Sequence, residues 1–440
     1  MDFITSWAHS NAMIISASIL ITAYIFIATE KIPKMTVALI GASLTLLLGL
    51  LGQSQKIGDK LDPHYFINFV DFNVIFLLVS MMIIVSIATR SGIFNWIANE
   101  MLKKTKGHPK TILCCLAFFT AIASAFLDNV TTVILIMPVT FAIAKELDIN
   151  PIPFLIVEIL ASNIGGTATL IGDPPNIIIG SAANFSFMNF IYELTIPVIV
   201  ILLTVVAIMT FWFRKCLHAT EERMAQITNL DNSKTITDKA LMIRSLLVLF
   251  LVILGFVTHD ITHIQTCVCA MAGASVLLLF EKPHEILHDV EWNTIFFFIG
   301  LFIIIGGFEA AGGIELMAKW LLDITHGSQA IASMVILWGS GILSGIIDNI
   351  PYTATMAPMI AEITTSKGMD FAYPLWWALS LGACLGGNMT IIGAAANVIV
   401  SETSAASGHP IKFMEYLKYG IVVTFISLAL STSYVWLKYL

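Results

Sequence analysis

The chain contains few charged residues. Of its 440 residues, 12% are Asp, Glu, Lys or Arg, whereas 58% are hydrophobic. Soluble globular proteins carry about 25% charged residues, so this composition excludes a soluble enzyme. The sequence also lacks a long polar segment that could form a separate soluble domain, and apolar runs of about 20 residues, enough for a transmembrane helix, recur from end to end. We therefore predict a single integral-membrane domain.

Cysteine and basic residues are also scarce. The cysteines lie mostly in apolar runs without the spacing of a metal site, which predicts packing thiols. The 22 Lys and Arg residues form no basic patch, so nucleic acid is not an expected partner. The N-terminal segment MDFITSWAHSN lacks the basic region and cleavage site of a signal peptide, and we expect the first apolar run to remain as a helix. The cysteines are Cys114, Cys115, Cys216, Cys267, Cys269 and Cys384.

The two halves of the chain repeat one pattern, which indicates that both adopt the same fold. The features that the halves share are polar, although most of the chain is apolar. The aligned segments are 70–92 with 290–312, 124–138 (SAFLDNVTTVILIMP) with 344–358 (SGIIDNIPYTATMAP), and 160–179 (LASNIGGTATLIGDPPNIII) with 381–400 (LGACLGGNMTIIGAAANVIV). The alignment superposes Asp128 on Asp348, Asn129 on Asn349, and Gly165, Gly166, Thr169, Gly172 and Asn176 on Gly386, Gly387, Thr390, Gly393 and Asn397.

Hydrophobicity predicts an all-α polytopic membrane protein with the same set of helices in each half. In segments 110–147 and 328–365 two apolar stretches meet at an Asp-Asn pair, which predicts two re-entrant helical hairpins. Glycine and proline interrupt the long spans that follow, so we expect two broken helices. The amphipathic segments 93–106 and 314–326 are predicted to lie along the membrane surface. The predicted spans are 12–29, 35–52, 71–90, 152–183 and 189–213, then 240–258, 264–280, 290–309, 372–405 and 415–437.

These elements predict two inverted repeats, because an odd number of crossings in each half reverses the orientation of the second. The first repeat is residues 1–215, with scaffold helices in 12–90, the hairpin 110–147, the broken helix 152–183 and the helix 189–213. Residues 216–239 form a connector. The second repeat is residues 240–440, with scaffold helices in 240–309, the hairpin 328–365, the broken helix 372–405 and the helix 415–437.

The distribution of basic residues predicts the orientation in the membrane. Most Lys and Arg residues fall on one side of the predicted topology, which the positive-inside rule assigns to the cytoplasm. The connector is then cytoplasmic and both termini lie outside, in a plasma membrane of the bacterial inner-membrane type. The basic residues on the sparse side are Lys56, Lys60, Lys319, Lys367 and Lys438.

The broken segment SNIGGTATLIGDPPNIII (162–179) predicts a binding site at the middle of the bilayer. Within hydrocarbon an unwound backbone persists only where it faces protein or a watery cavity. Its free carbonyl groups suit cations, and its free amide groups suit anions. Paired interrupted helices in inverted repeats are typical of secondary transporters.

The segments LDNVTT, IGDPPN and GGTATLIGDPPNIII, with their second-half counterparts, resemble the ion-transporter superfamily over nearly the whole chain. Within it, the arsenite permeases, the melanosomal P protein and the NhaD-type sodium/proton antiporters are the similar branch, and the P-protein-like subgroup is the most similar. The resemblance implies an elevator transporter, a homodimer in which a domain with the hairpins and broken helices slides against a scaffold. Dicarboxylate carriers of this superfamily have Ser-Asn-Thr at each hairpin tip. This chain departs from that pattern, with Asp128-Asn129-Val130 and Asp348-Asn349-Ile350.

We predict exchange of a monovalent cation, most simply Na⁺, for protons. Two carboxylates in a low-dielectric site repel an anion, and no Lys or Arg is predicted in the core to offset them. Asp128 and Asp348 would hold Na⁺ or a proton, and Asn129 and Asn349 would complete the sodium site. Asp173 has Ala394 as its counterpart and is either a third proton site or a helix cap. Further predicted ligands are Thr169, Gly172, Asn176, Thr390, Gly393 and Asn397.

Other functions stay open at this stage. Transport of chloride or a di- or tricarboxylate coupled to Na⁺ or H⁺ would use the same acidic pair, and arsenite efflux or a channel would use the same fold. A channel would conduct without coupled proton movement. Residues 284–288 (HEILH) match a zinc-protease pattern, but the short connector leaves no room for a helix in a cleft, so we predict a loop, no enzyme and no cofactor other than the coupling ion.

Further ionisable residues allow two interpretations each. Glu158 lies within a span and either relays protons or makes a structural hydrogen bond. Glu193 and Glu309 lie near span ends, where we expect their side chains to reach water. His259 and His263 are predicted to be surface residues or a minor pH sensor.

Overall fold

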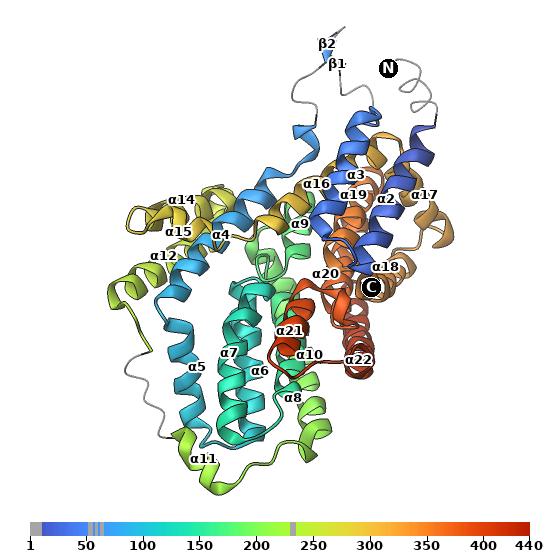
Figure 1. The fold of residues 1–440 in the computed structure, drawn as a ribbon. Coiled ribbons are helices and arrows are strands. Elements are labelled where there is room, and N and C mark those ends of the chain that lie inside the picture. The colour runs from blue at the N-terminus through green and yellow to red at the C-terminus, as the bar shows by residue number, and fades with distance from the viewer. Residues whose placement is uncertain (1–10, 52–55, 58–59, 62–65, 229–234) are drawn as a thin grey trace.

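The computed structural model describes residues 11–51, 56–57, 60–61, 66–228 and 235–440, and its fold is helical as predicted, apart from the two-residue strands β1 and β2 (Figure 1). The first half contains α2 (Ala12–Thr29), α3 (Lys34–Leu47), α4 (Phe72–Arg90), α5 (Ile93–Lys104), α6 (Pro109–Phe126), α7 (Asn129–Leu147), α8 (Ile152–Gly166), α9 (Pro174–Ala183) and α10 (Phe187–Trp212). The second half contains α12 (Lys239–Val257), α14 (Thr266–Leu278), α16 (Trp292–Ala310), α17 (Gly313–Ile324), α18 (Gln329–Ile347), α19 (Asn349–Lys367), α20 (Met369–Gly386), α21 (Ala395–Ala406) and α22 (Phe413–Tyr439). Short elements are β1 (Lys56–Ile57), β2 (Lys60–Leu61), η2 (Ile67–Phe69), η3 (Phe213–Lys215), α11 (Glu221–Thr228), α13 (His259–Thr262), α15 (Pro283–Leu287) and η4 (Ile391–Gly393).

Among the described residues, 9 helices are long and apolar enough to cross a membrane. Helices α3, α8 and α14 are apolar but shorter. Helix α3 ends at Leu47, before the predicted end of its span at residue 52, because Gly49 takes a φ of 66° that a helix cannot contain. The segment predicted as a loop around HEILH forms the helix α15, which is only 5 residues long. Within the described residues no group of three or more His, Cys, Asp or Glu side chains is arranged to hold a metal ion.

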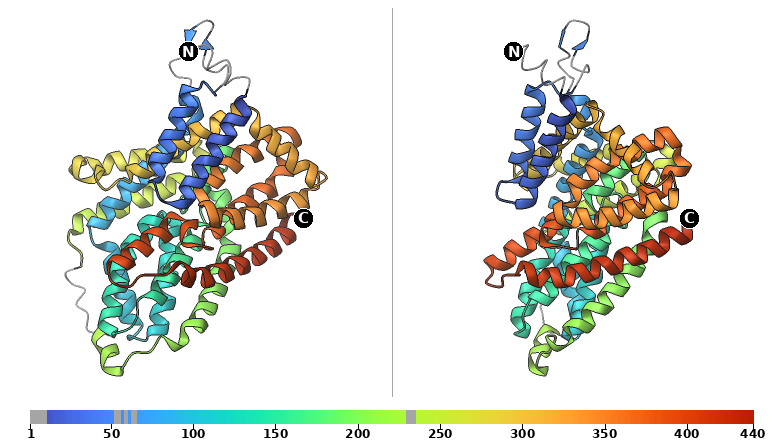
Figure 2. Two further views of the ribbon diagram at one scale, coloured as in Figure 1. Left: turned by 45° about the vertical axis from the view of Figure 1, so that its right-hand side comes forward. Right: turned by 90° about the vertical axis from the view of Figure 1, so that its right-hand side faces the viewer.

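The two hairpins and the two broken helices lie where the repeats predict them. Helices α6 and α7 meet at Leu127 and Asp128, and α18 and α19 meet at Asp348. The first broken helix is interrupted between α8 and α9, and the second between α20 and α21. The segments predicted to lie along the membrane surface form the helices α5 and α17. The last helices of the two halves, α10 and α22, contact each other (Figure 2).

Close packing of each hairpin on its broken helix depends on paired glycines. A Cβ atom on Gly165 would lie 2.1 Å from the carbonyl oxygen of Ala121 in α6. Its counterpart Gly386 packs in the same way, since a Cβ there would lie 2.5 Å from the carbonyl oxygen of Gly341 in α18. Small residues of this kind let transmembrane helices approach closely. The repeated glycines therefore position each hairpin tip against its helix break.

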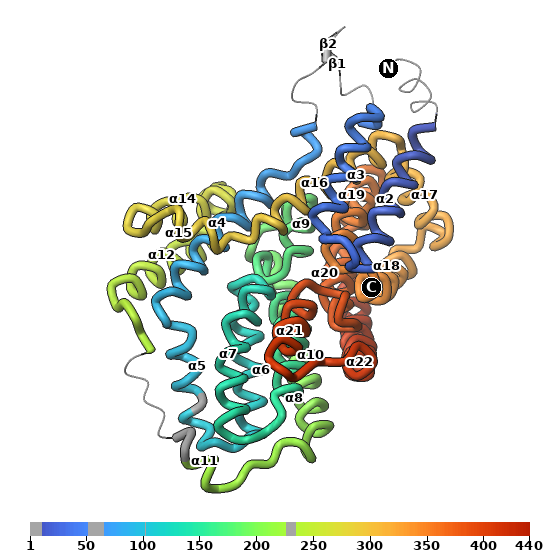
Figure 3. The backbone as a smooth tube through the Cα atoms, in the orientation of Figure 1, coloured from blue at the N-terminus to red at the C-terminus, as the bar shows by residue number. Residues whose placement is uncertain are grey.

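The halves of the chain interleave, as the course of the backbone shows (Figure 3). Helix α3 packs on α16, and α4 packs on α14, so the predicted scaffold helices α2, α3, α4, α12, α14 and α16 mix both repeats. Helix α9 packs against the second hairpin at α19, and α21 packs against the first hairpin at α7. Each hairpin tip is therefore in reach of the other half's broken helix.

Candidate ion-binding site

A cavity of about 250 Å³ lies where the two hairpin tips and the first helix break meet. Five of the predicted site residues line it, namely Asp128, Asn129, Asp173, Asp348 and Asn349. Both predicted aspartates of the acidic pair thus face one shared pocket. Other residues in its wall include Lys34, Glu291, Asn293, Thr294 and Phe297.

The first hairpin tip satisfies its aspartate locally. Asp128 is the N-cap of α7, a position that favours Asp because the carboxylate accepts from the free amides of the first helical turn. Its carboxylate accepts a 2.9 Å hydrogen bond from the backbone N–H of Thr131 and a short one from the Thr131 hydroxyl. The sequence Asp-Asn-Val-Thr therefore holds the side chain in place without help from another helix.

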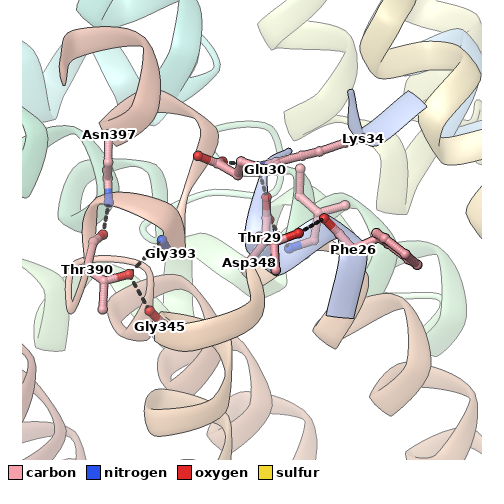
Figure 4. Close-up of polar contacts among 10 residues, drawn as sticks. Phe26, Thr29, Glu30, Lys34, Gly345, Asp348, Thr390, Gly393 and Asn397 are labelled. Carbon is pink, nitrogen blue, oxygen red and sulfur yellow. Dashed lines mark hydrogen bonds and ion pairs between the residues drawn. The ribbon is translucent and has the colours of Figure 1, made fainter. Parts of the chain in front are cut away.

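The second hairpin tip uses a distant residue. Asp348 accepts a 3.0 Å hydrogen bond from the backbone N–H of Ile350 and a 2.6 Å hydrogen bond from the Nζ atom of Lys34 (Figure 4). This contact corrects the prediction that no Lys or Arg offsets the acidic pair. Lys34 was assigned to the cytoplasmic end of a span, but its long side chain reaches from the start of α3 into the cavity.

Asp173 lies at the centre of the site and joins the two tips. Its Oδ1 atom accepts from the Nδ2 atoms of Asn129 at 3.1 Å and Asn349 at 3.3 Å, and its Oδ2 atom accepts from Asn349 at 3.2 Å. Asp173 stands at the N-cap position of α9, but its side chain makes no capping hydrogen bond there. The alternative that Asp173 caps the half-helix is therefore wrong, and its side chain is committed to the hairpin asparagines.

The remaining predicted ligands lie behind the cavity and close the two helix breaks. Asn176 donates to the carbonyl oxygens of Thr167 at 3.0 Å and Thr169 at 2.9 Å. Its counterpart Asn397 donates to those of Gly387 at 2.7 Å and Thr390 at 2.9 Å.

Thr390 also ties its break to the second hairpin. Its hydroxyl donates to the carbonyl oxygen of Gly345 at 2.6 Å and accepts from the N–H of Gly393 at 3.1 Å (Figure 4). In the first half the Thr169 hydroxyl donates to the carbonyl of Ala125 and accepts from Gly172 at 3.2 Å. These six residues thus hold the unwound backbone beside each tip.

Several residues of the site were missed from the sequence. Besides Lys34 they include Glu291, which lines the cavity, and Asn163, which accepts from Asn129 at 3.3 Å and donates to Asn397 at 2.9 Å. Glu291 aligns with Asp71 at the start of a repeated segment, and Asn163 lies inside the broken-helix motif. The repeat therefore carried a signal for Glu291 and the broken-helix motif carried one for Asn163, but neither pointed to Lys34.

Two further glutamates, Glu158 and Glu193, lie away from the cavity. Glu158 accepts a short hydrogen bond from the Thr140 hydroxyl, and its Oε2 atom has no hydrogen-bond partner within the described part of the chain. Glu193 forms a 2.5 Å ion pair with Lys438 and accepts from the hydroxyl of Tyr373 at 3.1 Å. Its side chain is 12% exposed, so Glu193 reaches water only in part, whereas Glu309 is exposed as predicted. The aromatic residues and Lys438 at the end of α22 enclose Glu193 instead.

Comparison with solved structures supports the fold. The crystal structure of the YdaH transporter of Alcanivorax borkumensis matches with a TM-score of 0.56 over 94% of this chain and 97% of that chain. The two sequences are 12% identical, so this likeness concerns the fold alone. That transporter is described as having an unusual topology.

Comparison with protein families and curated proteins identifies the relatives. A family model described as "Citrate transporter" matches residues 24–382. The 46 kDa membrane protein of Mycobacterium leprae is 40% identical over 97% of this chain and 99% of its own length, and an uncharacterized transporter of Mycobacterium tuberculosis is 40% identical over 97% and 98%. The P protein of Mus musculus is 29% identical over 97% of this chain but 60% of its own length. These matches confirm the resemblance to the ion-transporter superfamily, and names of relatives as transporters support a role other than catalysis. The chain is therefore a secondary transporter that belongs to the citrate transporter family.

Proposed function

We propose that this transporter exchanges a monovalent cation, Na⁺ in the first instance, for protons. The observation that carries the proposal is the charge of the cavity wall. The carboxyl groups of Asp128, Asp173, Glu291 and Asp348 line it, and among the described residues of the wall the only Lys or Arg is Lys34. The excess of carboxyl groups favours a cation or bound protons over an anion.

Coulomb's law gives the size of the interactions between charges in the site. At an effective dielectric constant of 20, two unit charges that are 4 to 8 Å apart interact by about 2 to 4 kcal/mol. An unneutralised anion would meet this repulsion from more than one carboxylate. A Na⁺ ion would gain from the same charges, and oxygen ligands are the type that hard cations take.

Na⁺ and protons would compete for the same oxygen atoms, and this competition would couple their movements. A carboxylate of the site holds either a metal ion or a proton, so binding of one favours release of the other. Asp173 is 0% exposed and contacts both hairpin tips, so a change in its occupant acts on both halves of the site at once. We propose that the hairpins and broken helices then carry the ion past the predicted scaffold as an elevator, in a homodimer whose termini lie outside the cell.

A second candidate is transport of a carboxylate anion coupled to Na⁺ or H⁺. The description of the matching family model and the ammonium group of Lys34 in the cavity wall favour it. For this function the coupling ions would first have to neutralise the acidic side chains.

Flux in proteoliposomes separates these functions. The purified protein is reconstituted with a pH-sensitive dye inside, an imposed pH gradient is established, and Na⁺, Li⁺, K⁺, Cl⁻, citrate and arsenite are added in turn. We expect Na⁺ or Li⁺ to dissipate the gradient. If only an anion does so, and Asp128→Asn keeps that activity, the exchange proposal is wrong.

A further inference from the structure

Lys34 occupies a position that helix stability does not explain. It is the first residue of α3, directly after the N-cap Pro33. The positive end of the helix dipole lies at the N-terminus, so a cation there is unfavourable for the helix itself. The charge is therefore offset by contacts with other elements.

Those contacts join a predicted scaffold helix to the second hairpin tip. The Nζ atom of Lys34 lies 2.6 Å from Oδ2 of Asp348 and 3.4 Å from Oε1 of Glu30 (Figure 4). Asp348 is 1% exposed, whereas the side chain of Lys34 is 23% exposed. One partner is thus buried in the site and the other retains access to solvent.

The same scaffold helices hold the first turn of α19 by a second contact. The hydroxyl of Tyr24 in α2 donates to the carbonyl oxygen of Pro351 at 2.6 Å and makes a short hydrogen bond with Thr355. Asp348 itself has a φ of 119°, a conformation that is unfavourable for a residue with a side chain. The tip is therefore held in a strained shape beside α2 and α3.

We propose that Lys34 is a built-in competitor for the transported cation at Asp348. This inference rests on the proposed cation exchange and adds the residue that regulates it. In the empty site the ammonium group occupies Oδ2 of Asp348 and ties the hairpin to α3. A cation that binds Asp348 displaces the ammonium group and frees the hairpin from the scaffold, so that only an occupied site is released.

Cation binding to variants of the full-length protein in detergent tests this competition. The half-saturating Na⁺ concentration is measured from the rise in melting temperature, which reports binding to the folded state. Lys34→Met should lower that concentration about 10-fold, within the range of typical coupling between sites, and Lys34→Arg should leave it within about twofold of wild type. Lys31→Met is the matched control, because Lys31 is exposed and does not line the cavity. A purely structural Lys34 would lower the melting temperature without changing the half-saturating concentration.

Chemical labelling tests the displacement directly. An ion-paired ammonium group reacts poorly with an amine-acylating reagent, so Na⁺ should raise the labelling of Lys34 about fivefold or more, the low end of typical coupling. Lys31 in the same segment serves as the internal standard. Labelling of Lys34 that does not change with Na⁺ overturns the proposal.

The remaining outcomes of these experiments also decide whether Lys34 competes with the transported cation. If Lys34→Met does not fold, Lys34→Gln keeps a hydrogen-bond donor without the charge and should show the same 10-fold change. If neither variant folds and Lys34→Arg does, the charge is structural and the proposal is wrong. Absence of any response of the wild type to Na⁺, Li⁺ and K⁺ overturns both the exchange function and the competition. A wild-type response that is unchanged in Lys34→Met overturns the competition alone.

Discussion

The two hairpin tips carry the same Asp-Asn pair but satisfy the aspartate in different ways. At the first tip Thr131 supplies both a backbone N–H and a hydroxyl to Asp128. The aligned residue at the second tip is Pro351, which has neither group. Asp348 therefore takes Lys34 as its partner, across the boundary to α3. Asp348 keeps a local cap through the N–H of Ile350, and the difference at this one position adds a contact between two parts of the transporter.

The break between α8 and α9 also differs from its counterpart by the polar group of a single residue. Asp173 supplies a carboxylate to the asparagines of both tips, whereas Ala394 has no group to offer. The site is thus built from two similar tips around Asp173, an acid that has no acidic counterpart in the other repeat. The largest functional effect is expected at that acid, and smaller ones at the tips.

Replacement of Asp173 should have the largest effect on transport. Asp173→Asn keeps the size of the side chain but removes the charge, and we expect a loss of exchange of about 100-fold, equivalent to about 2.7 kcal/mol. The rate of Na⁺-driven pH change in proteoliposomes measures it. Asp323→Asn, at an exposed position in α17, is the matched control and should keep full activity. Exchange near the wild-type level in Asp173→Asn would remove this residue from the mechanism.

The tips should differ in what they contribute to stability. Asp348→Ala breaks an ion pair with one buried partner, and we expect the free energy of unfolding to fall by about 2 to 3 kcal/mol, below the full cost of a buried pair because Lys34 is partly exposed. Asp128→Ala removes an N-cap and should cost about 1 kcal/mol. Thermal unfolding in detergent, scanned at one rate, compares the two variants. Equal losses would show that Lys34 adds nothing to the second tip.

Replacement of Pro351 by the residue found at the first tip should make the second tip resemble the first. Pro351→Thr gives Asp348 a local hydroxyl, so Lys34→Met in this background should be about 1 kcal/mol less destabilising than in the wild type, the typical net value of a hydrogen bond. The difference between the double variant and the two single variants measures this coupling. Additive effects of the two substitutions would contradict the explanation given for Pro351.

Glu291 should give the smallest effect, on the pH dependence of transport. This residue precedes the span α16, and burial raises its pKa to about 7, with a further contribution from the negative charge of Asp128. It is neutral below that pH and charged above it, so the cavity attracts cations more strongly as the pH rises from 6 to 8. We expect a gain of about twofold to threefold in Na⁺ affinity over this interval, which corresponds to less than 1 kcal/mol.

A matched pair of variants checks the pH prediction. Glu291→Gln should show a flatter dependence of Na⁺ affinity on pH, because the neutral amide does not titrate. Glu222→Gln, at an exposed position in α11, should follow the wild type. Identical pH profiles for the wild type and Glu291→Gln would exclude Glu291 as a titrating group of the site.

Much of the fold follows from the sequence because the repeated polar motifs mark special backbone positions in an apolar chain. The Asp-Asn pairs locate both hairpin turns, and the glycines and prolines locate both helix breaks. Ends of helices were predicted less well, as at Leu47, because hydropathy does not detect where a glycine leaves the helix.

Positions of site residues relative to one another were harder to predict. Asp128 and Asp348 were found because the repeat pairs them, but the central place of Asp173 depends on contacts between the halves that no local pattern encodes. Lys34 was missed for a related reason. A lysine near the end of a span is typical of a surface residue, and only the packing of α3 beside the second hairpin shows where its side chain ends.

The broken helix of each half packs on the hairpin of the other, α9 on α19 and α21 on α7. This arrangement has a consequence for how such a site is assembled. Asn163 of the first half donates to Asn397 of the second, so contacts between the halves complete the packing around the helix breaks. A polypeptide of half the present length would therefore need a second molecule to complete such a site. Because both halves now belong to one chain, each can differ from the other without losing its partner, as they do at Asp173 and Ala394 and at Thr131 and Pro351.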